Sequence, residues 1–251
     1  VLHSLRYLEV AVSEPSPGVP QFMSTAYLDG IPFTRYDSER GRREPLTQWM
    51  EDVFEPGYWE RETQICEGWR HVEARNLEIA RERYNQSRGL HTRLWVYGCD
   101  LLSDGSIHAS IRLGYDGRDH ISDHISFDPK SGKFMLADSS AETIGKRWEQ
   151  EGIDIEVWMN YLKHECPELL RKYIGYRQKE LESKVPPDVH VSGKEEDGTL
   201  ILSCHMYGFY PNTIAVSWMK GADTLDQETE WGGIVPNSDG TFHTWARIEA
   251  L

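Results

Sequence analysis

Two Asp-His pairs are the residues of this sequence that could most directly do chemistry. Asp119 and His120 stand close to Asp123 and His124, and carboxylates and imidazoles at short spacing are common metal ligands. The residues around them are polar, and this composition is more typical of a solvated hairpin than of a metal site. We therefore expect neither a metal ion nor a cofactor.

The sequence lacks the short motifs from which most enzymatic mechanisms start. None of the patterns HExxH, GxSxG, GxxxxGKS/T and GxGxxG occurs, so hydrolysis, phosphoryl transfer and dinucleotide binding have no starting residue. The formal net charge of -14 would repel a phosphate backbone, and no run of Lys and Arg offsets it locally. We expect a protein that is not an enzyme and does not bind nucleic acid.

The four cysteines favour long-range disulfides over redox or zinc chemistry. No two of them have the CxxC spacing that is typical of a zinc ribbon or a thioredoxin-type site. They are Cys66, Cys99, Cys166 and Cys204. The sequence also holds an Asn-x-Ser/Thr sequon at Asn85, and a glycan there would require the secretory route.

The elements that must position these residues are visible as changes in the spacing of apolar residues. Strand-like runs come first, and two of them flank Asp29-Gly30, a hairpin turn. Within 55–88, apolar residues then recur at steps of three and four, which predicts one long helix. The expected strands are 3–12, 22–28 and 31–36.

The same order of elements repeats in the residues that follow. Further strand-like runs precede a second helix from about 139 to about 183, bent where Gly152 and Pro167 disfavour an unbroken helix interior. Strands and then a helix, twice over, indicate an internal duplication. The expected strands are 91–102, 107–115, 121–127 and 133–136.

The two halves predict an α+β platform followed by an all-β domain. Their strands can pair into one antiparallel sheet with both helices on one face, which leaves a trough between the helices. Beyond Lys184 the composition is typical of strands, and Cys204 and Trp218 have the spacing of the buried pair in an immunoglobulin sandwich. We expect three parts, at 1–88, 89–183 and 184–251.

Eight short motifs along nearly the whole chain resemble class I heavy chains of the major histocompatibility complex (MHC). Each motif lies on the strand, helix or turn that the pattern of apolar residues predicts at that place, and the eight occur in the same order as in the family. They are His-Ser-Leu-Arg-Tyr at 3–7, Tyr58-Trp59, Tyr84-Asn-Gln-Ser at 84–87, Tyr97-Gly-Cys-Asp at 97–100, Tyr115-Asp-Gly at 115–117, Cys166-Pro-Glu-Leu-Leu-Arg-Lys-Tyr at 166–173, Gly208-Phe-Tyr-Pro at 208–211 and Asp239-Gly-Thr-Phe at 239–242.

The resemblance implies the architecture of the extracellular part of a class I molecule. That architecture is an antiparallel eight-stranded sheet topped by two long helices, an immunoglobulin-like β-sandwich and a partner subunit, β2-microglobulin. A disulfide would join Cys99 to Cys166, whereas the partner of Cys204 would lie beyond the chain end, so the sandwich is expected to be incomplete. The protein would stand at the cell surface as a single-pass membrane protein whose anchor is absent from this chain.

The resemblance also implies antigen presentation, in which a short peptide is displayed to T-cell or natural killer cell receptors. Arg83, Arg147 and Trp148 match the positions that hold the peptide carboxylate, although Ile144 stands where a hydroxyl donor is usual. The tyrosines that match the positions around the peptide amino end are Tyr7, Tyr58, Tyr161 and Tyr173.

The middle of the expected groove is less ordinary and keeps an alternative ligand open. Trp69 and Trp158 would point in from the two helices, and Trp95 and Tyr97 would rise from the floor beside Glu9. Bulky aromatic side chains narrow a trough. The alternative is a specialised class I-like molecule that holds a hydrophobic non-peptide ligand, a lipid or a small metabolite.

Several single positions bear on these alternatives. We expect Glu9 to form a buried ion pair with Arg93. Arg43 stands where a metabolite-presenting relative has a lysine, and a guanidinium does not form a Schiff base. We favour burial of Cys66 over a free thiol that faces the groove.

Other departures from peptide-presenting members lie nearer the ends of the groove. Leu169 replaces a common tryptophan, and the hairpin region between Gly117 and Phe134 is longer than usual. In the third domain, Gln227 and Glu228 resemble the acidic loop that T-cell coreceptors bind in this family.

Overall fold

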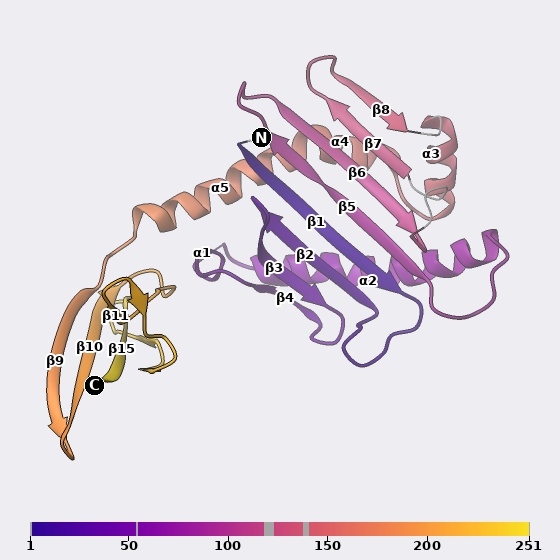
Figure 1. Ribbon diagram of the computed structural model, residues 1–251. Helices are drawn as coiled ribbons and strands as arrows, with labels where there is room; N and C mark the ends of the chain where they lie inside the picture. The colour runs from indigo at the N-terminus through magenta and orange to yellow at the C-terminus, as the bar shows by residue number, and fades with distance from the viewer. Residues whose placement is uncertain (1, 54, 118–122, 138–140, 251) are drawn as a thin grey trace. The chain divides into compact units, whose positions relative to one another are not determined.

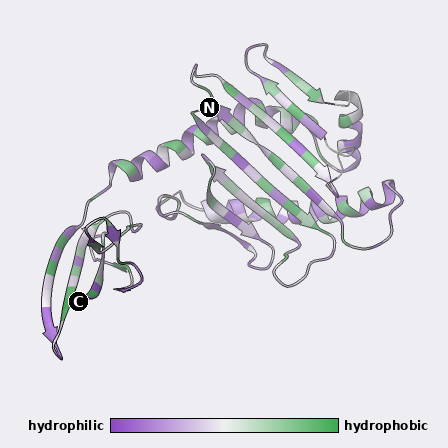
Figure 2. Cartoon of the chain, viewed as in Figure 1, coloured by the Kyte–Doolittle hydropathy of each residue, from purple (hydrophilic) through white to green (hydrophobic). Residues whose placement is uncertain are grey.

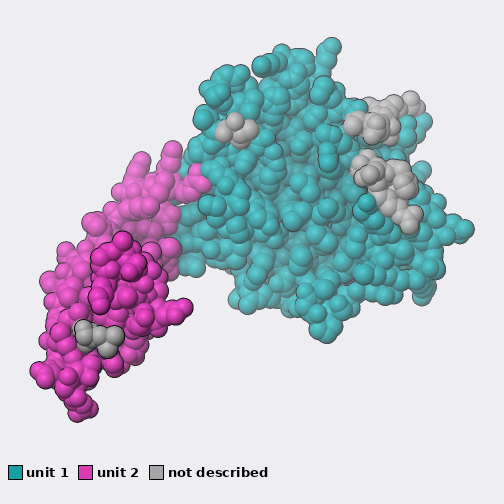
Figure 3. Space-filling model, in the orientation of Figure 1, with its two compact units in different colours: residues 1–176 teal, residues 177–251 magenta. Residues whose placement is uncertain are grey.

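The computed structural model describes residues 2–53, 55–117, 123–137 and 141–250. The chain forms two compact units, residues 1–176 and residues 177–251, which Figure 3 distinguishes by colour. The division falls within a helix, so the domain boundaries expected near 88 and 184 stay predictions.

The first unit is built on one antiparallel sheet of eight strands, in the order β4-β3-β2-β1-β5-β6-β7-β8. The tight turn at Asp29-Gly30 has both residues at positive φ, 53° and 79°, as a two-residue hairpin requires. A short strand at 42–45 extends the expected set. The strands are β1 (His3–Val12), β2 (Phe22–Leu28), β3 (Ile31–Asp37), β4 (Arg42–Pro45), β5 (Thr92–Leu101), β6 (Ile107–Tyr115), β7 (Asp123–Asp128) and β8 (Lys133–Ala137).

The long helical segments lie on one face of this sheet (Figure 1). A short helix α1 (Gln48–Glu51) precedes α2 (Tyr58–Arg83), which is one unbroken helix as predicted. The second segment is divided, in order, into α3 (Ala141–Gln150), α4 (Ile155–Asn160), the π-helical turn η2 (Tyr161–Glu165) and α5 (Cys166–Glu182). The fold class expected from the sequence is therefore confirmed for this unit.

The second helical segment is irregular near both of its expected points. Gly152 has a φ of 70°, and Asp154 starts the next helix by accepting a hydrogen bond from the backbone N–H of Glu156 at 2.9 Å. An irregularity also lies next to Pro167, where the π-helical turn η2 runs directly into α5 and the proline is the second residue of α5. A proline inside a helical run disturbs the preceding turn, which is the turn that is π-helical here.

Strand register decides which side chains face the helices. Alternate residues of β1, from Leu5 to Ala11, are buried on the helix side, and the same alternation continues through β5, β6 and β7. Figure 2 shows the resulting bands of hydrophilic and hydrophobic residues along the strands. One cross-sheet row contains Arg43, Tyr36, Ser24, Glu9, Trp95, Leu113 and Asp123.

The second unit is an immunoglobulin-like β-fold, as predicted. Cys204 is a free, buried thiol that packs against Met206, Phe209 and Ala246, with Trp218 beside them. A five-stranded sheet and a separate two-stranded pair form the unit. The strands are β9 (Asp188–Glu196), β10 (Thr199–Phe209), β11 (Met219–Lys220), β12 (Asp223–Thr224), β13 (Thr229–Trp231), β14 (Val235–Pro236) and β15 (Phe242–Ala250).

None of the helices among the described residues is long and apolar enough to cross a membrane.

A disulfide between Cys99 on β5 and Cys166 at the start of α5 is present, as the resemblance implied. It closes a loop of 67 residues, and the chain-entropy model assigns such a loop up to about 4 kcal/mol of stabilisation. Replacing both cysteines by serine should therefore lower the melting temperature, by up to roughly 8–16 °C. Reduced wild-type protein should have the same melting temperature as the double variant. If oxidised wild type also melted at that temperature, the disulfide would not contribute to stability as assigned.

His91 links the start of β5 to the loop after α2. Its Nδ1 lies 2.7 Å from Asp116 and its Nε2 lies 2.9 Å from the carbonyl oxygen of Ser87. The hydrogen bond with Asp116 and the one with Ser87 raise the pKa of His91 above its ordinary value of 6.5.

Because the folded-state pKa is raised, the stabilisation from His91 is fully present below pH 6.5 and is lost as pH rises through the folded pKa. In thermal unfolding, the melting temperature of wild type should exceed that of His91→Gln at low pH. This difference should shrink as pH rises through the folded-state pKa of His91. The exposed His71, changed to Gln, serves as the control. A gap between wild type and His91→Gln that stays constant with pH would refute the linkage.

Candidate ligand groove

At one end of the trough, side chains from both helical segments and the floor bring the four predicted tyrosines together. Tyr58 on α2 and Tyr173 on α5 share a hydrogen bond, with their hydroxyl oxygens 2.8 Å apart. Tyr7 on β1 stacks on Tyr97 of β5, with ring centroids 5.0 Å apart. The hydroxyl of Tyr161 is shielded from solvent and has no hydrogen-bond partner in the described part of the chain.

Burial keeps these phenols neutral. It raises the pKa of Tyr7, Tyr58, Tyr161 and Tyr173 above the usual range of tyrosine. Each hydroxyl can therefore donate one hydrogen bond and accept others at any physiological pH. These hydroxyls can therefore bind a polar group as neutral donors and acceptors, while Arg43 and Glu62 supply charge nearby.

Below the tyrosines lies a buried polar cluster that is connected differently from the sequence-based expectation. Glu9 accepts hydrogen bonds from the hydroxyls of Tyr97 at 2.8 Å and Ser24 at 3.1 Å. Burial raises the pKa of the Glu9 carboxyl. The expected ion pair between Glu9 and Arg93 is wrong, because Arg93 turns to two carboxylates at the opposite end of the trough.

Arg43 is the cation that approaches this cluster. It donates to Ser24 at 2.7 Å and to Thr34 at 2.7 and 3.0 Å, and its Nη1 lies 3.4 Å from the sulfur of Cys66. The thiol of Cys66 is buried, as we expected, and burial raises its pKa to about 11. Cys66 is therefore a packed thiol, and a reactive thiolate is disfavoured there.

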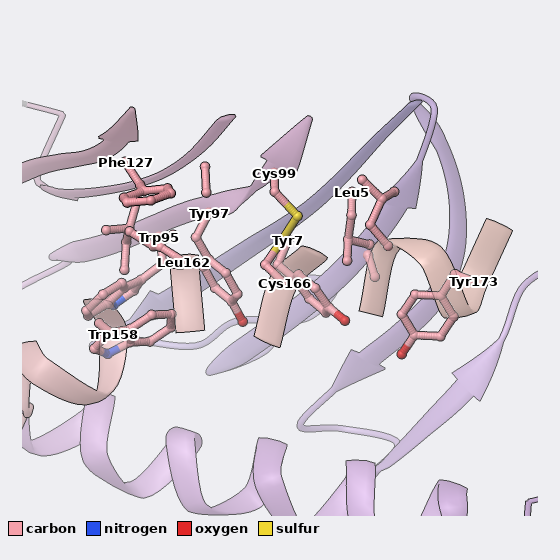
Figure 4. Close-up of a cluster of buried hydrophobic side chains, with 14 of the residues drawn as sticks. Leu5, Tyr7, Trp95, Tyr97, Cys99, Phe127, Trp158, Leu162, Cys166 and Tyr173 are labelled. Atoms are coloured by element: carbon pink, nitrogen blue, oxygen red, sulfur yellow. A yellow bond between two sulfur atoms is a disulfide. The ribbon is translucent and has the colours of Figure 1, made fainter. Parts of the chain in front are cut away.

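The four tryptophan and tyrosine side chains predicted for the middle of the trough pack on one another. Trp95 of the floor stacks on Trp158 of α4 at 5.4 Å between ring centroids, and Tyr97 meets Trp158 edge-on at 4.9 Å. Figure 4 shows Trp95, Tyr97 and Trp158 close together. Trp69 of α2 reaches across to Trp158, with 5.8 Å between ring centroids, so the two helical walls touch at this point.

The predicted carboxylate-binding groups gather at the far end, but each already has a partner from within the chain. Nη1 of Arg83 lies 2.9 Å from Oε1 of Glu151. Arg147 pairs with Asp123, and the indole N–H of Trp148 donates to the same carboxylate at 2.8 Å. The cavity that these groups help to line measures about 10 Å³, which is room for a single water molecule at most.

Arg93 completes this end of the groove. It donates to Glu73 of α2 at 2.8 Å and to Glu151 at 3.0 Å, and all three side chains are almost fully buried. The sequence analysis did not single out either glutamate. Glu73 could have been found, because it follows Trp69 by one helical turn on the inward face of α2.

The remaining predicted positions lie as follows. Ile144 is fully buried and Leu169 packs against the main core. The carboxylate of Asp123 pairs with Arg147 and accepts a hydrogen bond from Trp148. Asp119 and His120 lie outside the described residues. In the second unit, Gln227 and Glu228 are exposed, and in the first unit Asn85 is exposed just after α2.

Comparison with known proteins matches both units. A family model described as class I histocompatibility antigen, domains alpha 1 and 2, matches residues 1–181, and one described as immunoglobulin C1-set domain matches residues 188–250.

Individual relatives match over almost the whole chain. The F10 alpha chain of the class I histocompatibility antigen of Gallus gallus is 43% identical over 99% of this chain and 71% of its own length. Major histocompatibility complex class I-related protein 1 of Bos taurus is 38% identical over 98% of this chain and 72% of its own. The protein of the same name from Rattus norvegicus is 36% identical over 98% and 71%.

Proteins of this family stand at the cell surface, present antigens and are not enzymes. The sheet, the two helical walls, the Cys99–Cys166 disulfide and the immunoglobulin-like unit agree with the family matches over both parts of the chain. The chain belongs to the MHC class I family.

Proposed function

We propose that this class I molecule presents a small non-peptide ligand, held in the half of the groove lined by the tyrosines. The observation that carries the proposal is the contact between Trp69 and Trp158, whose ring centroids are 5.8 Å apart. These rings belong to opposite walls, α2 and α4, and Trp95 supports both from the floor. The groove is thereby divided across its width.

The width left between the two walls supports a ligand other than an extended peptide that spans the groove. A peptide inserted between two rings needs a van der Waals distance of about 3.5 Å to each ring. The two ring planes must then lie roughly 7 Å apart. Rings 5.8 Å apart at 46° already touch each other. A peptide backbone could pass only if Trp69 or Trp158 left the cluster, which would expose apolar surface that is now buried.

The chemistry of the tyrosine half suits a compact ligand with polar groups at its edge. The hydroxyl of Tyr161 and the indole N–H of Trp95 are buried without hydrogen-bond partners among the described residues. A buried unsatisfied group costs about 1–3 kcal/mol, so a ligand acceptor that met either donor would recover this energy. Aromatic faces around these donors favour a ring-shaped or other hydrophobic body.

The retained tyrosines also support the second candidate, display of a short peptide. Tyr7, Tyr58, Tyr161 and Tyr173 converge at one end as they would around a peptide amino group. Such a peptide would have to be held at this end alone. The far end offers about 10 Å³ of space and no cation without a carboxylate partner among the described residues lining it.

The assembly that we propose follows the class I pattern. β2-microglobulin would cover the sheet face opposite the helices, where Met23 and Leu94 are more than one third exposed. A membrane anchor would hold the complex at the cell surface. T-cell or natural killer cell receptors would recognise the helices, and a coreceptor would bind the exposed loop at Gln227 and Glu228.

Ligand elution tests the proposal directly. The protein is secreted from cells together with β2-microglobulin, and bound molecules are released with acid and with organic solvent for mass spectrometry. We expect small organic molecules with hydrogen-bond acceptors and no peptides of a narrow length range. Recovery of such a peptide set from wild-type protein would refute the proposal in favour of peptide display.

Opening the groove should change what it holds. Changing Trp69 and Trp158 together to Ala removes the contact between the walls, so larger ligands should elute. The cost in stability should be about 3–5 kcal/mol for the buried Trp158 and less for the half-buried Trp69. Trp231→Ala, at an exposed position in the other unit, provides the control. An unchanged size range of ligands from a folded double variant would show that the tryptophans do not limit ligand size.

A further inference from the structure

The far end of the groove is closed by an ion network that contains equal numbers of cations and anions. Glu151 lies at its centre and accepts from Arg83 at 2.9 Å and from Arg93 at 3.0 Å. Its connected members are Arg83, Arg93, Glu73 and Glu151, and the pair of Arg147 with Asp123 lies beside them on the same small cavity. Among the described residues, these three cations and three anions are paired with one another.

The break between α3 and α4 places Glu151 in this position. The chain leaves α3 at Gln150 and turns at Gly152, and Nη2 of Arg75 on α2 donates to the backbone oxygen of Glu151 at 3.2 Å. A Cβ on Gly152 would lie 2.6 Å from that Nη2 atom, and the φ of 70° at this position itself favours glycine. Arg75 and Arg83 thus fix the turn to α2 through its backbone and its side chain.

Burial makes the charge balance matter. The side chains of Glu151 and Asp123 are 2% and 8% exposed, and that of Arg93 is 3% exposed. Arg83 and Arg147 are less buried, with 25% and 27% of their side chains exposed. Another carboxylate brought to the buried side of this end would add an unpaired negative charge, at a high desolvation cost. To bind there, it would first have to displace Glu151 or Asp123 from its arginine.

We infer that Glu151 and Asp123 are specificity-determining residues that occupy the place of a ligand carboxylate. Asp123 receives the two donors, from Arg147 and Trp148, that would otherwise be free for such a group. Glu151 receives Arg83 from the opposite wall. The network holds α2, the floor and the α3–α4 turn together without a ligand, and it restricts ligands to the tyrosine half.

This inference deepens the proposed function, because it explains how one half of the groove stays closed while a small ligand occupies the other. It depends on that proposal only for the position of the ligand.

Chemical rescue tests the inference. Glu151→Ala removes the central carboxylate and leaves Arg83 without its partner, so the purified protein should melt more than about 5 °C below wild type. Sodium acetate should restore at least half of this loss in the variant and leave wild type unchanged. Acetamide and sodium chloride at the same concentration should restore nothing, because neither supplies a carboxylate.

The neighbouring Glu149→Ala provides a matched control, since Glu149 is an exposed carboxylate near the end of α3, two residues before Glu151, and the variant should respond to none of the additives. If Glu151→Ala does not fold, Asp123→Ala is tested in the same way, and Arg83→Gln should lower the melting temperature without responding to acetate. Acetate that stabilises wild type would overturn the inference by showing an open carboxylate site. A destabilised variant that ignores acetate would overturn it as well, because the network would then be only structural.

The result can be separated from ligand elution. If peptides elute from wild type and acetate does not raise its melting temperature, the proposed function is refuted but the inference about the far end is not. If small ligands elute and acetate does raise the melting temperature, the inference is refuted but the proposed function is not.

Discussion

The register of the eight-stranded sheet is the constraint on which the groove depends. Because side chains alternate between the two faces of a strand, pairing Glu9 with Trp95, and Trp95 with Leu113, places a carboxylate, an indole and an aliphatic side chain in one line beneath the helices. A shift by one residue would turn all three away. The same row continues to Asp123, and so joins the buried acid under the tyrosines to the acid at the far end.

Electrostatics gives the two ends of the groove opposite characters. At the tyrosine end, neutral phenols surround a single buried carboxylate, Glu9, which is held by hydroxyl donors and approached by Arg43 through Ser24. At the far end, charged groups are already matched with one another. Among the described residues, the buried polar atoms of the groove without a hydrogen-bond partner are the hydroxyl of Tyr161 at the tyrosine end, the indole N–H of Trp95 in the dividing cluster and the amide oxygen of Asn76 beside Glu73.

The sequence was sufficient for the features that periodicity and resemblance encode, and insufficient where a long side chain selects among partners. The strands, the turn at Asp29-Gly30, the break at Gly152 and the pairing of Cys99 with Cys166 could all be predicted. The partner of Arg93 could not, because a guanidinium on a flexible stem can reach several carboxylates from one backbone position. Tertiary contact with Glu73 and Glu151 decided it.

A similar limit applied to Arg83, Arg147 and Trp148. Their positions on the walls of the groove could be predicted from the resemblance, but their freedom to bind a ligand could not. That freedom depends on Asp123, which the sequence offered as a possible metal ligand, and on Glu151, which follows α3 with no motif to mark it. Whether a side chain can bind a ligand depends on its residue type and equally on whether its donors and acceptors are already paired within the chain. In this groove the hydroxyl of Tyr161, a donor without a partner among the described residues, favours the tyrosine half as the place where a ligand binds.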